Sequence, residues 1–299
     1  MQRPHANTET DRSQLQAASL VAVSDARELP GEARQPGAAH GPVTCEIRAL
    51  ETVGELIESY RLRYAVYRAL GYLQHSNESD LEIDSYDARS IPFGAFDAVS
   101  GAMIGTLRLI TKVRQPEYDL AVLRVVAACD DEELAAQAFE PRPYALPSIV
   151  SADLERQIEA FNPEGLIVHE LSRTIVRPGH RGKGVSRGLV ELGLAHASRL
   201  GPTVVIGGCL PAHLELYAKF GCQPVPQTEL ERFDSVGQLA NTVICRTDVL
   251  PQPTRAHVDE LTRWITAGST ECTLEIGRDS CARYRIATPR RARRRTRES

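Results

Sequence analysis

The segment RGKGVS, which spans residues 181–186, has the composition of a phosphate-binding loop. Its two glycines, Gly182 and Gly184, lack the side chains that would keep backbone N–H groups away from a ligand. The apolar and polar pattern that follows predicts a helix over residues 186–200, whose dipole would direct its positive end at the loop. We therefore expect the end of the preceding strand and this loop to bind a phosphate through Val176, Arg181, Gly182, Lys183, Gly184, Val185 and Ser186.

The sequence around residues 181–186 fits neither of two common nucleotide-binding loops. A P-loop requires a glycine at the position of Arg177, and the dinucleotide fingerprint requires its third glycine at the position of Arg187. The sequence does match an RxxGxG/A-type loop with Ser186 at its last position. Such a loop resembles the acyl-CoA loop of the GNAT acyltransferase superfamily, and an ordinary Gly-rich turn is the alternative.

A second group of polar residues lies largely within apolar segments. Arg108 ends the strand-like segment 104–107, and both Glu170 and Arg173 lie inside LIVHELSRTIV, residues 166–176. Charges inside strands are costly unless they are paired, so packing alone does not explain these residues. The group is completed by Arg63, Asp84 and Asp87.

These residues resemble the acyl-homoserine-lactone synthases and the related long-chain N-acyl amino acid synthases, a branch of acyltransferases that shares the GNAT fold. The matching motifs cover about residues 50–225 and are RxxVY (63–67), Gly71-Tyr72, DxxD (84–87), Gly-Thr-x-Arg ending at Arg108, and ELSR (170–173). Two features depart from the lactone synthases. Tyr67 and Tyr72 stand where those enzymes carry Phe and Trp, and the stretch between Arg108 and Glu170 is much longer. The long insertion favours the N-acyl amino acid synthases and weakens the case for S-adenosylmethionine as the amine substrate.

The resemblance implies an α/β fold of the GNAT acyl-CoA N-acyltransferase type, with a mixed central sheet, a splayed strand pair and flanking helices. Periodicity predicts helices over 50–69, 130–139, 152–160, 186–200, 212–220 and 254–267, and strands over 92–98, 103–111, 166–176, 203–206 and 241–248. Residues three apart lie on opposite faces of a regular strand, so Glu170 and Arg173 can share a face only across a bulge. The implied fold has such a bulge, which would open the sheet to a pantetheine arm and turn a backbone N–H toward the thioester carbonyl.

The chemistry we expect is the attack of an amine on an acyl thioester. A protonated amine is no nucleophile, so a base must remove its proton, and we expect an apolar strand to raise the pKa of Glu170 for that task. Asp84 or Asp87 could instead hold the amine or act through water. Tyr217, in LYAKFG, matches the GNAT tyrosine that can protonate the departing thiolate, and a packed core tyrosine is the alternative. The expected substrate-binding residues, which would anchor an acceptor carboxylate or fix the acids, are Arg63, Arg108, Arg173, Tyr67 and Tyr72.

Structural roles remain open for the charged motifs. Asp84 and Asp87 could form a solvated turn, and Glu170 with Arg173 could be a structural ion pair. A calcium loop that starts at Asp80 would need glycine and glutamate where Ser85 and Ile91 stand, so we expect no metal there. The seven scattered cysteines include no CxxC pair, which argues against a disulfide framework and a zinc site.

Composition divides the 299-residue chain into four parts. We expect a disordered leader over 1–42, a GNAT-like acyltransferase domain over 43–250, a helix and strand over 251–282 that complete or cover it, and an Arg-rich disordered tail over 283–299. No apolar run is long enough to cross a bilayer and no signal peptide is evident, so we expect a cytoplasmic location. Without the basic tail the body is more acidic than the net charge of -4, which argues against DNA binding by the folded part.

We therefore expect an N-acyltransferase that moves a medium or long acyl chain to a small amine, such as an amino acid. The donor would be acyl-CoA or an acyl carrier protein, with no tightly bound cofactor. Four alternatives remain: a short-chain N-acetyltransferase that uses acetyl-CoA, an acyl-homoserine-lactone synthase, a non-catalytic regulator that binds acyl thioesters, and a nucleic-acid adaptor that acts through its tail. The sequence leaves the oligomeric state open.

Overall fold

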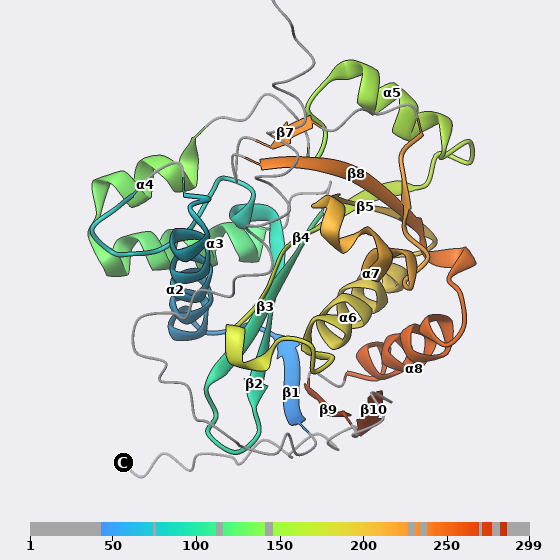
Figure 1. Cartoon of the computed structure of the whole chain (residues 1–299). Helices are drawn as coiled ribbons and strands as arrows, with labels where there is room; N and C mark the ends of the chain where they lie inside the picture. Colours follow the sequence, from blue (N-terminus) through green and yellow to red (C-terminus); the bar gives the residue numbers. More distant parts are fainter. Residues whose placement is uncertain are drawn as a thin grey trace, which may run out of the picture.

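The structure is a computed structural model that describes residues 43–73, 76–111, 116–140, 146–226, 231–233, 238–268, 271–276 and 282–285. Figure 1 shows the arrangement of the elements. The expected leader over 1–42 and the arginine block of the expected tail lie outside the described residues, and the predictions made for them are not tested.

A mixed β-sheet runs through the described part of the molecule in the order β10-β9-β1-β2-β3-β4-β5-β8-β6, with β7 paired to β8 (Figure 1). The strands are β1 Val43–Ala49, β2 Ser90–Asp97, β3 Met103–Ile110, β4 Ile167–Val176, β5 Thr203–Cys209, β6 Gln223–Pro224, β7 Glu231–Phe233, β8 Gln238–Arg246, β9 Glu271–Ile276 and β10 Ala282–Arg285. Among these strands β4 and β5 are parallel and the other neighbours are antiparallel. The sheet confirms the predicted mixed α/β fold.

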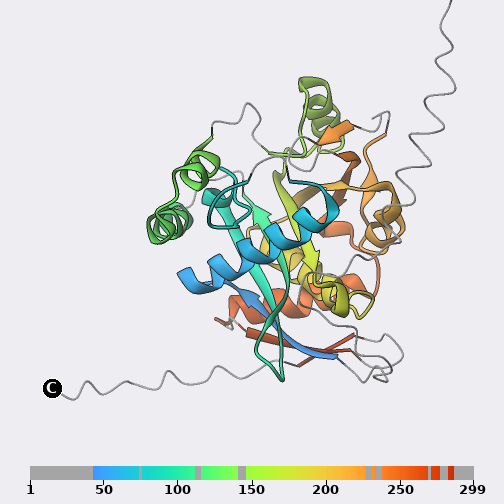
Figure 2. The ribbon, with the colours of Figure 1, turned by 60° about the vertical axis from the view of Figure 1, so that its left-hand side comes forward.

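Helices flank both faces of this sheet. They are α2 Val53–Leu70, α3 Pro116–Cys129, α4 Glu132–Phe139, α5 Ala152–Ala160, α6 Val185–Arg199, α7 Leu214–Ala218 and α8 Thr254–Thr266, with short 3-10 turns η1 Asp87–Arg89, η2 Pro178–His180, η3 Pro211–His213 and η4 Thr247–Val249. Figure 2 shows α2, in blue, crossing in front of the central strands, with α3 and α4 beside it. The helices α6 and α8 pack against each other, and α6 contacts the sheet from β1 to β5.

Most of the predicted elements are present within a few residues of their predicted ends. The helix predicted over 50–69 starts after Thr52, which forms a capping box with Glu55, and it ends at Gly71, whose φ of 72° suits a glycine C-cap. The element predicted over 212–220 is shorter, because the turn η3 precedes α7. The prediction did not include β1, α3, β6, β7 or β10, and it placed a strand within 251–282 without giving the bounds of β9. Through β9, which pairs with β1, and α8, the segment after residue 250 completes the sheet and covers α6.

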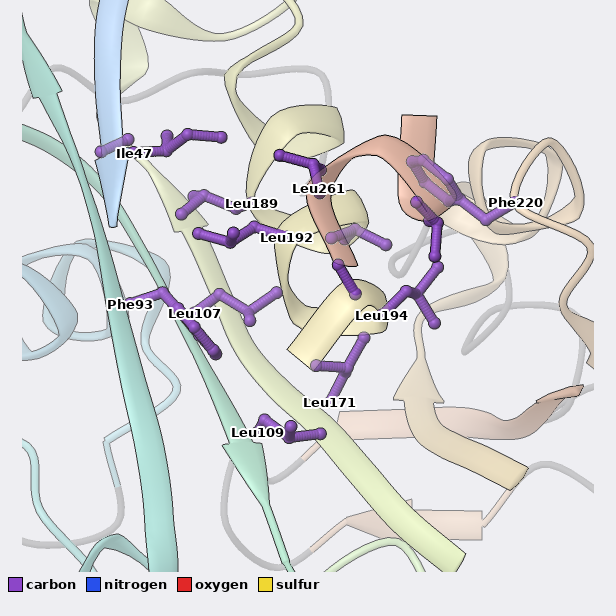
Figure 3. Packing of buried hydrophobic residues seen from close by; sticks show 14 of the residues in the cluster. Ile47, Phe93, Leu107, Leu109, Leu171, Leu189, Leu192, Leu194, Phe220 and Leu261 are labelled. Atoms are coloured by element: carbon purple, nitrogen blue, oxygen red, sulfur yellow. The ribbon is translucent and has the colours of Figure 1, made fainter. Parts of the chain in front are cut away.

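The main hydrophobic core lies between the sheet and α6. Leu107 of β3 and Leu171 of β4 meet Leu189 and Leu192 of α6, and Leu261 of α8 packs behind them (Figure 3). The helix comes close because it carries glycine at the contact: a Cβ atom at position 193 would lie 2.7 Å from Leu171 Cδ2.

Successive side chains of β3 point to opposite faces of the sheet, and the two faces differ in polarity. Leu107 and Leu109 face α6, whereas Thr106 faces α2, where its hydroxyl lies 2.6 Å from that of Ser59. Arg108 therefore lies on the same face as α2.

The parallel strands β4 and β5 separate partway along their length. Their pairing ends at Glu170 opposite Ile206, after which β4 continues to pair with β3 and β5 with β8. A bulge interrupts the β3–β4 ladder between Thr106 and Arg108, and the backbone of Arg173 there has a φ of 56°. The predicted bulge and the predicted splayed strand pair are both confirmed.

The point of separation should not tolerate a larger residue. A Cβ atom at Gly207 would lie 2.9 Å from the backbone oxygen of Leu171, which cannot move without shifting β4. We expect Gly207→Ala to lower the free energy of unfolding by about 1–3 kcal/mol, measured by urea denaturation.

The matched control for this change is Gly54→Ala in α2. There the new methyl group meets no atom of the described residues within 4 Å. It should raise the free energy of unfolding by about 0.5–1 kcal/mol, because alanine is the better helix former. Equal effects of the two variants would show that β4 and β5 are not in tight contact at this point.

Candidate active site

A cavity of about 440 Å³ lies where β4 and β5 separate. It falls within the range of about 300–1,000 Å³ that is typical of ligand sites. Its walls come from α2, β4, the loop before α6 with the start of that helix, and the end of β5 with the residues that follow it, together with Pro147, Ser148 and Ala240 of β8. Much of the lining is apolar and comes from Val66, Leu70, Leu171, Ile175, Val176, Leu210 and Leu216.

The predicted phosphate loop forms one end of this cavity. Gly182 and Gly184 have φ values of 71° and 78°, a conformation that favours glycine. Gly184 is the N-cap of α6, and no side chain caps this helix end, so the N–H groups of its first turn remain available for an anion. Of the seven predicted contact residues, those that line the cavity are Val176, Arg181, Gly182, Val185 and Ser186, while Lys183 and Gly184 lie between them in the chain.

The basic residues around the loop differ in their partners. Arg181 is exposed, and its Nε donates to the Val176 carbonyl at 3.1 Å. Arg187 instead donates to the buried carboxylate of Glu191 at 2.9 Å. Arg181 is therefore better placed than Arg187 to meet a phosphate at the cavity mouth.

Glu170 also lines the cavity and is only 2% exposed. Its Oε2 accepts a hydrogen bond of 2.9 Å from the backbone N–H of Ser148. Burial raises the pKa of Glu170 to about 7, although the Ser148 hydrogen bond and the positive charges of Arg108 and Arg173 act in the opposite direction. This is the direction expected for a carboxyl group in an apolar strand, and it brings the pKa close to neutral pH.

Beside the cavity lies a set of six charged residues that we call the buried ion-pair cluster: Arg63, Arg108, Arg173, Glu82, Asp84 and Asp87. Arg63 binds both oxygens of Asp87 at 2.7 and 3.0 Å and also donates to Glu82. Arg108 binds both oxygens of Asp84 at 2.6 and 2.9 Å. Such two-point pairs fix the geometry of both partners.

Arg173 joins this cluster from the bulge in β4. Its Nε donates to Glu82 at 2.9 Å and its Nη2 donates to Asp84 at 2.9 Å. The bulge brings Arg173 to the same face as Ser172, whose Oγ accepts from Arg108 at 2.9 Å. Three arginines and three carboxylates thus balance in charge.

The buried ion-pair cluster makes Asp84 and Asp87 differ from Glu170 in pKa. Burial opposes the charged form of Asp84, but Arg108 and Arg173 hold the pKa of that carboxyl well below its usual range. The pKa of Asp87 is also lowered, by Arg108 and Arg63. A carboxylate with a low pKa is a weak proton acceptor, and neither aspartate lines the cavity. The geometry therefore favours Glu170 over Asp84 and Asp87 as the base.

Only some of the predicted substrate-binding residues line the cavity. Tyr67, Tyr72 and Arg173 line the cavity, whereas Arg63 and Arg108 do not. The rings of Tyr67 and Tyr72 lie 6.0 Å apart, and the Arg173 guanidinium lies 5.5 Å from the Tyr67 ring centre. Of the two roles expected for Arg63 and Arg108, the structure shows that they hold the acids.

Tyr217 lines the cavity opposite the bulge. Burial raises the pKa of its phenol above the ordinary value, and a side-chain hydrogen bond with Thr174 acts in the opposite direction. The phenol therefore keeps its proton at neutral pH.

A comparison with protein families bears on the same part of the chain. Residues 62–191 match the family model described as acetyltransferase (GNAT) domain. The chain carries a GNAT acetyltransferase domain. The protein is accordingly an acyltransferase, and the matched residues contain the bulged strand, the predicted phosphate loop and Glu170.

Several solved structures are similar to this chain at low identity. FeeM, an N-acyl amino acid synthase from uncultured soil microbes, is 16% identical with a TM-score of 0.49, over 74% of this chain and 96% of that one. TofI, in a complex with an inhibitor and MTA, is 18% identical with a TM-score of 0.47, over 72% and 96%. BjaI, a CoA-dependent acyl-homoserine lactone synthase, is 15% identical with a TM-score of 0.45, over 74% and 90%. No curated protein matches the chain.

Two features are absent from the residues that the structure describes. Among them, no helix has both the length and the apolar character needed to cross a membrane. Within the same residues, no three His, Cys, Asp or Glu side chains gather in a way that could hold a metal ion.

Two residues that take part in the site were not predicted from the sequence. Glu82 could have been found from the alternation of Leu81 and Ile83, which are buried, with Glu82 and Asp84, which share the other side. Ser148 had no such signal, because it lies in a proline-rich stretch without periodicity.

Glu170 makes the stability of the protein depend on pH. Its carboxyl group has an ordinary pKa of 4.5 in an unfolded chain and about 7 in the folded one. Between these values the folded state binds more protons than the unfolded state. The free energy of unfolding should therefore fall by about 3 kcal/mol as the pH rises through this window, and this contribution should be constant above it.

Glu170→Gln should remove this contribution, because glutamine does not titrate. Denaturation below and above the window should show that the variant gains about 3 kcal/mol relative to the parent at the higher pH. The control is Glu133→Gln, at an exposed position on α4, which should keep the parental dependence. If Glu170→Gln keeps it as well, Glu170 does not titrate near neutral pH.

Proposed function

We propose that the protein transfers a medium or long acyl chain from an acyl thioester to the nitrogen of a small amine, such as an amino acid. One observation carries this proposal. A loop suited to a phosphate and a buried glutamate with a pKa of about 7 line the same cavity. The loop would bind the phosphate of a phosphopantetheine thioester, and the glutamate would remove the proton from an amine nucleophile.

The donor would lie between the separated strands. Its phosphate would bind the first turn of α6, and its pantetheine arm would extend between β4 and β5 toward Glu170. Residues Leu171 to Thr174 line the cavity and do not pair with β5, so a backbone N–H there can stabilise the oxygen that becomes negative during the reaction. The exposed Arg181 suits either coenzyme A or an acidic acyl carrier protein, and no tightly bound cofactor is needed.

The reaction that we propose passes through a tetrahedral intermediate and forms no covalent bond to the enzyme. Glu170 takes one proton from the ammonium form of the amine, and the neutral nitrogen then forms a bond to the thioester carbonyl carbon. When the tetrahedral intermediate collapses, the C–S bond breaks and its electron pair leaves with sulfur. Tyr217 gives its proton to this thiolate and is reprotonated through water by the second proton that the nitrogen loses, while Glu170 releases the first proton to solvent. The products are an amide and a free thiol.

The lining of the cavity supports an acyl chain longer than acetyl. Aliphatic residues from α2 and β4, such as Val66, Leu70 and Ile175, face the space beyond the loop. For the acceptor, the resemblance of the motifs to N-acyl amino acid synthases favours an amino acid, and Tyr67 and Tyr72 add aromatic surface. The cytoplasmic location and the use of a carrier protein stay predictions.

Glu170→Gln should abolish most of the transfer activity. Loss of the base should lower kcat by about 10²–10⁴-fold. In the parent, kcat should rise with pH through about 7, as Glu170 loses its proton, and this rise should be absent in the variant. Thiol release from acyl-CoA substrates of increasing chain length, with a panel of amines, measures both effects. A variant that matches the parent across the pH range would exclude Glu170 as the base.

Gly184→Glu should weaken donor binding. The change places a side chain and a negative charge at the N-cap of α6, where the backbone has a φ of 78°. Titration calorimetry with coenzyme A should show at least about a tenfold loss of affinity, since like charges then meet at the phosphate site. The control is Gly201→Glu, which adds the same charge and a similar backbone strain beyond the other end of α6, at a φ of 113°. Equal affinity of both variants would contradict the assignment of the loop.

A further inference from the structure

Ser148 lies against Glu170 at the wall of the cavity and is held there by its backbone. Its N–H donates to Glu170 Oε2 at 2.9 Å, and its carbonyl accepts a hydrogen bond of 3.2 Å from Thr242 Oγ1 of β8. The neighbours Leu146 and Ile149 are buried in a hydrophobic cluster with residues of β5 and β8. The position of Ser148 is therefore fixed without any contribution from its side chain.

The hydroxyl group of Ser148 is buried and has no hydrogen-bond partner among the described residues. The residue is 1% exposed and lines the cavity. Its hydroxyl lies close enough to the Glu170 carboxyl to lower the pKa of that group, and no donor among the described residues reaches its oxygen. A buried hydroxyl without a partner destabilises a fold, so alanine would serve the structure at least as well.

The Glu170 carboxylate can accept more hydrogen bonds than it receives. The Ser148 N–H donates to Oε2, and the Ser148 hydroxyl is the other group of the described residues that acts on this carboxylate as a hydrogen-bond donor. The hydroxyl and the carboxylate thus lie side by side in two residues that line the cavity. A ligand with two or more N–H groups on one nitrogen can satisfy both.

We propose that Ser148 Oγ and the Glu170 carboxylate together bind the acceptor's amino group, with Ser148 accepting one N–H and Glu170 accepting another. This inference rests on the proposed function and makes it more specific, because it selects amines whose nitrogen carries at least two N–H bonds. The two hydrogen bonds hold the nitrogen in place while Glu170 takes its proton. Ser148 lies in the stretch between Arg108 and Glu170 that is longer than in the lactone synthases, so this insertion supplies part of the acceptor site.

The test compares two probe amines by titration calorimetry above the pKa of Glu170. n-Hexylamine and N,N-dimethylhexylamine both carry one positive charge when protonated, but only the primary amine can donate to both oxygens. We expect Ser148→Ala to weaken binding of n-hexylamine about tenfold and to leave binding of the tertiary amine unchanged. Ser148→Thr, which keeps the hydroxyl, should bind n-hexylamine as the parent does.

A matched control lies in the same insertion. Ser151 is the N-cap of α5, and its Oγ accepts from the Leu154 N–H at 3.1 Å. Ser151→Ala should lower the free energy of unfolding and leave amine binding unchanged. Ser148→Ala should not lower the free energy of unfolding, since no described residue meets the hydrogen-bond criteria with its hydroxyl.

Three results would overturn the inference: equal affinity of Ser148→Ala and the parent for n-hexylamine, an equal loss for both amines, or no binding of n-hexylamine by the parent. A different result would contradict the proposed function. A parent protein that releases no thiol from any acyl thioester, yet binds n-hexylamine through Ser148, would retain this amine site and lose the transfer reaction.

Discussion

The separation of β4 from β5 is the constraint on which the rest of the structure depends. Parallel strands that stop pairing leave backbone groups without ladder partners, and such groups are costly unless something else binds them. Here the pairing stops at Glu170 opposite Ile206, and the cavity begins at that point. The opening therefore creates the space for a ligand and the unpaired backbone that can bind it.

The buried ion-pair cluster holds this opening in shape. It links Arg63 of α2, the acids of residues 82–87, Arg108 of β3 and Arg173 of the bulge. Arg173 has a φ of 56°, which a non-glycine residue adopts only when its surroundings compensate. Because removal of one partner from a buried pair typically costs about 3–5 kcal/mol, the cluster is a rigid support beside the cavity and a poor place for a proton to move.

Much of the fold could be read from the sequence, because long periodic segments and glycine loops carry strong local signals. The α2 helix, the β2–β3 hairpin and the β4–loop–α6 unit are examples, and the motif resemblance supplied the bulge. The strand β1 was missed because its seven residues follow a stretch rich in Gly and Pro and depend on pairing with β2 and β9. Tertiary pairing of this kind leaves little trace in local periodicity.

The candidate site was predictable to a different extent. An apolar strand around Glu170 was enough to indicate a raised pKa, and two glycines were enough to indicate the loop. The partners of the arginines could not be assigned, because distant acids compete for them and the choice depends on three-dimensional distance. The place of Ser148 in the site could not be predicted for the same reason, because its neighbours Glu170 and Thr242 lie 22 and 94 residues away in the chain.

The glycine at position 193 has a wider consequence. It allows α6 to rest directly on Leu171, the residue next to Glu170. The loop precedes α6, and β4 carries Glu170. The contact between α6 and β4 therefore sets the distance between the loop and the carboxyl group. A larger residue at position 193 would push α6 away from β4 and so increase the distance between the loop and Glu170.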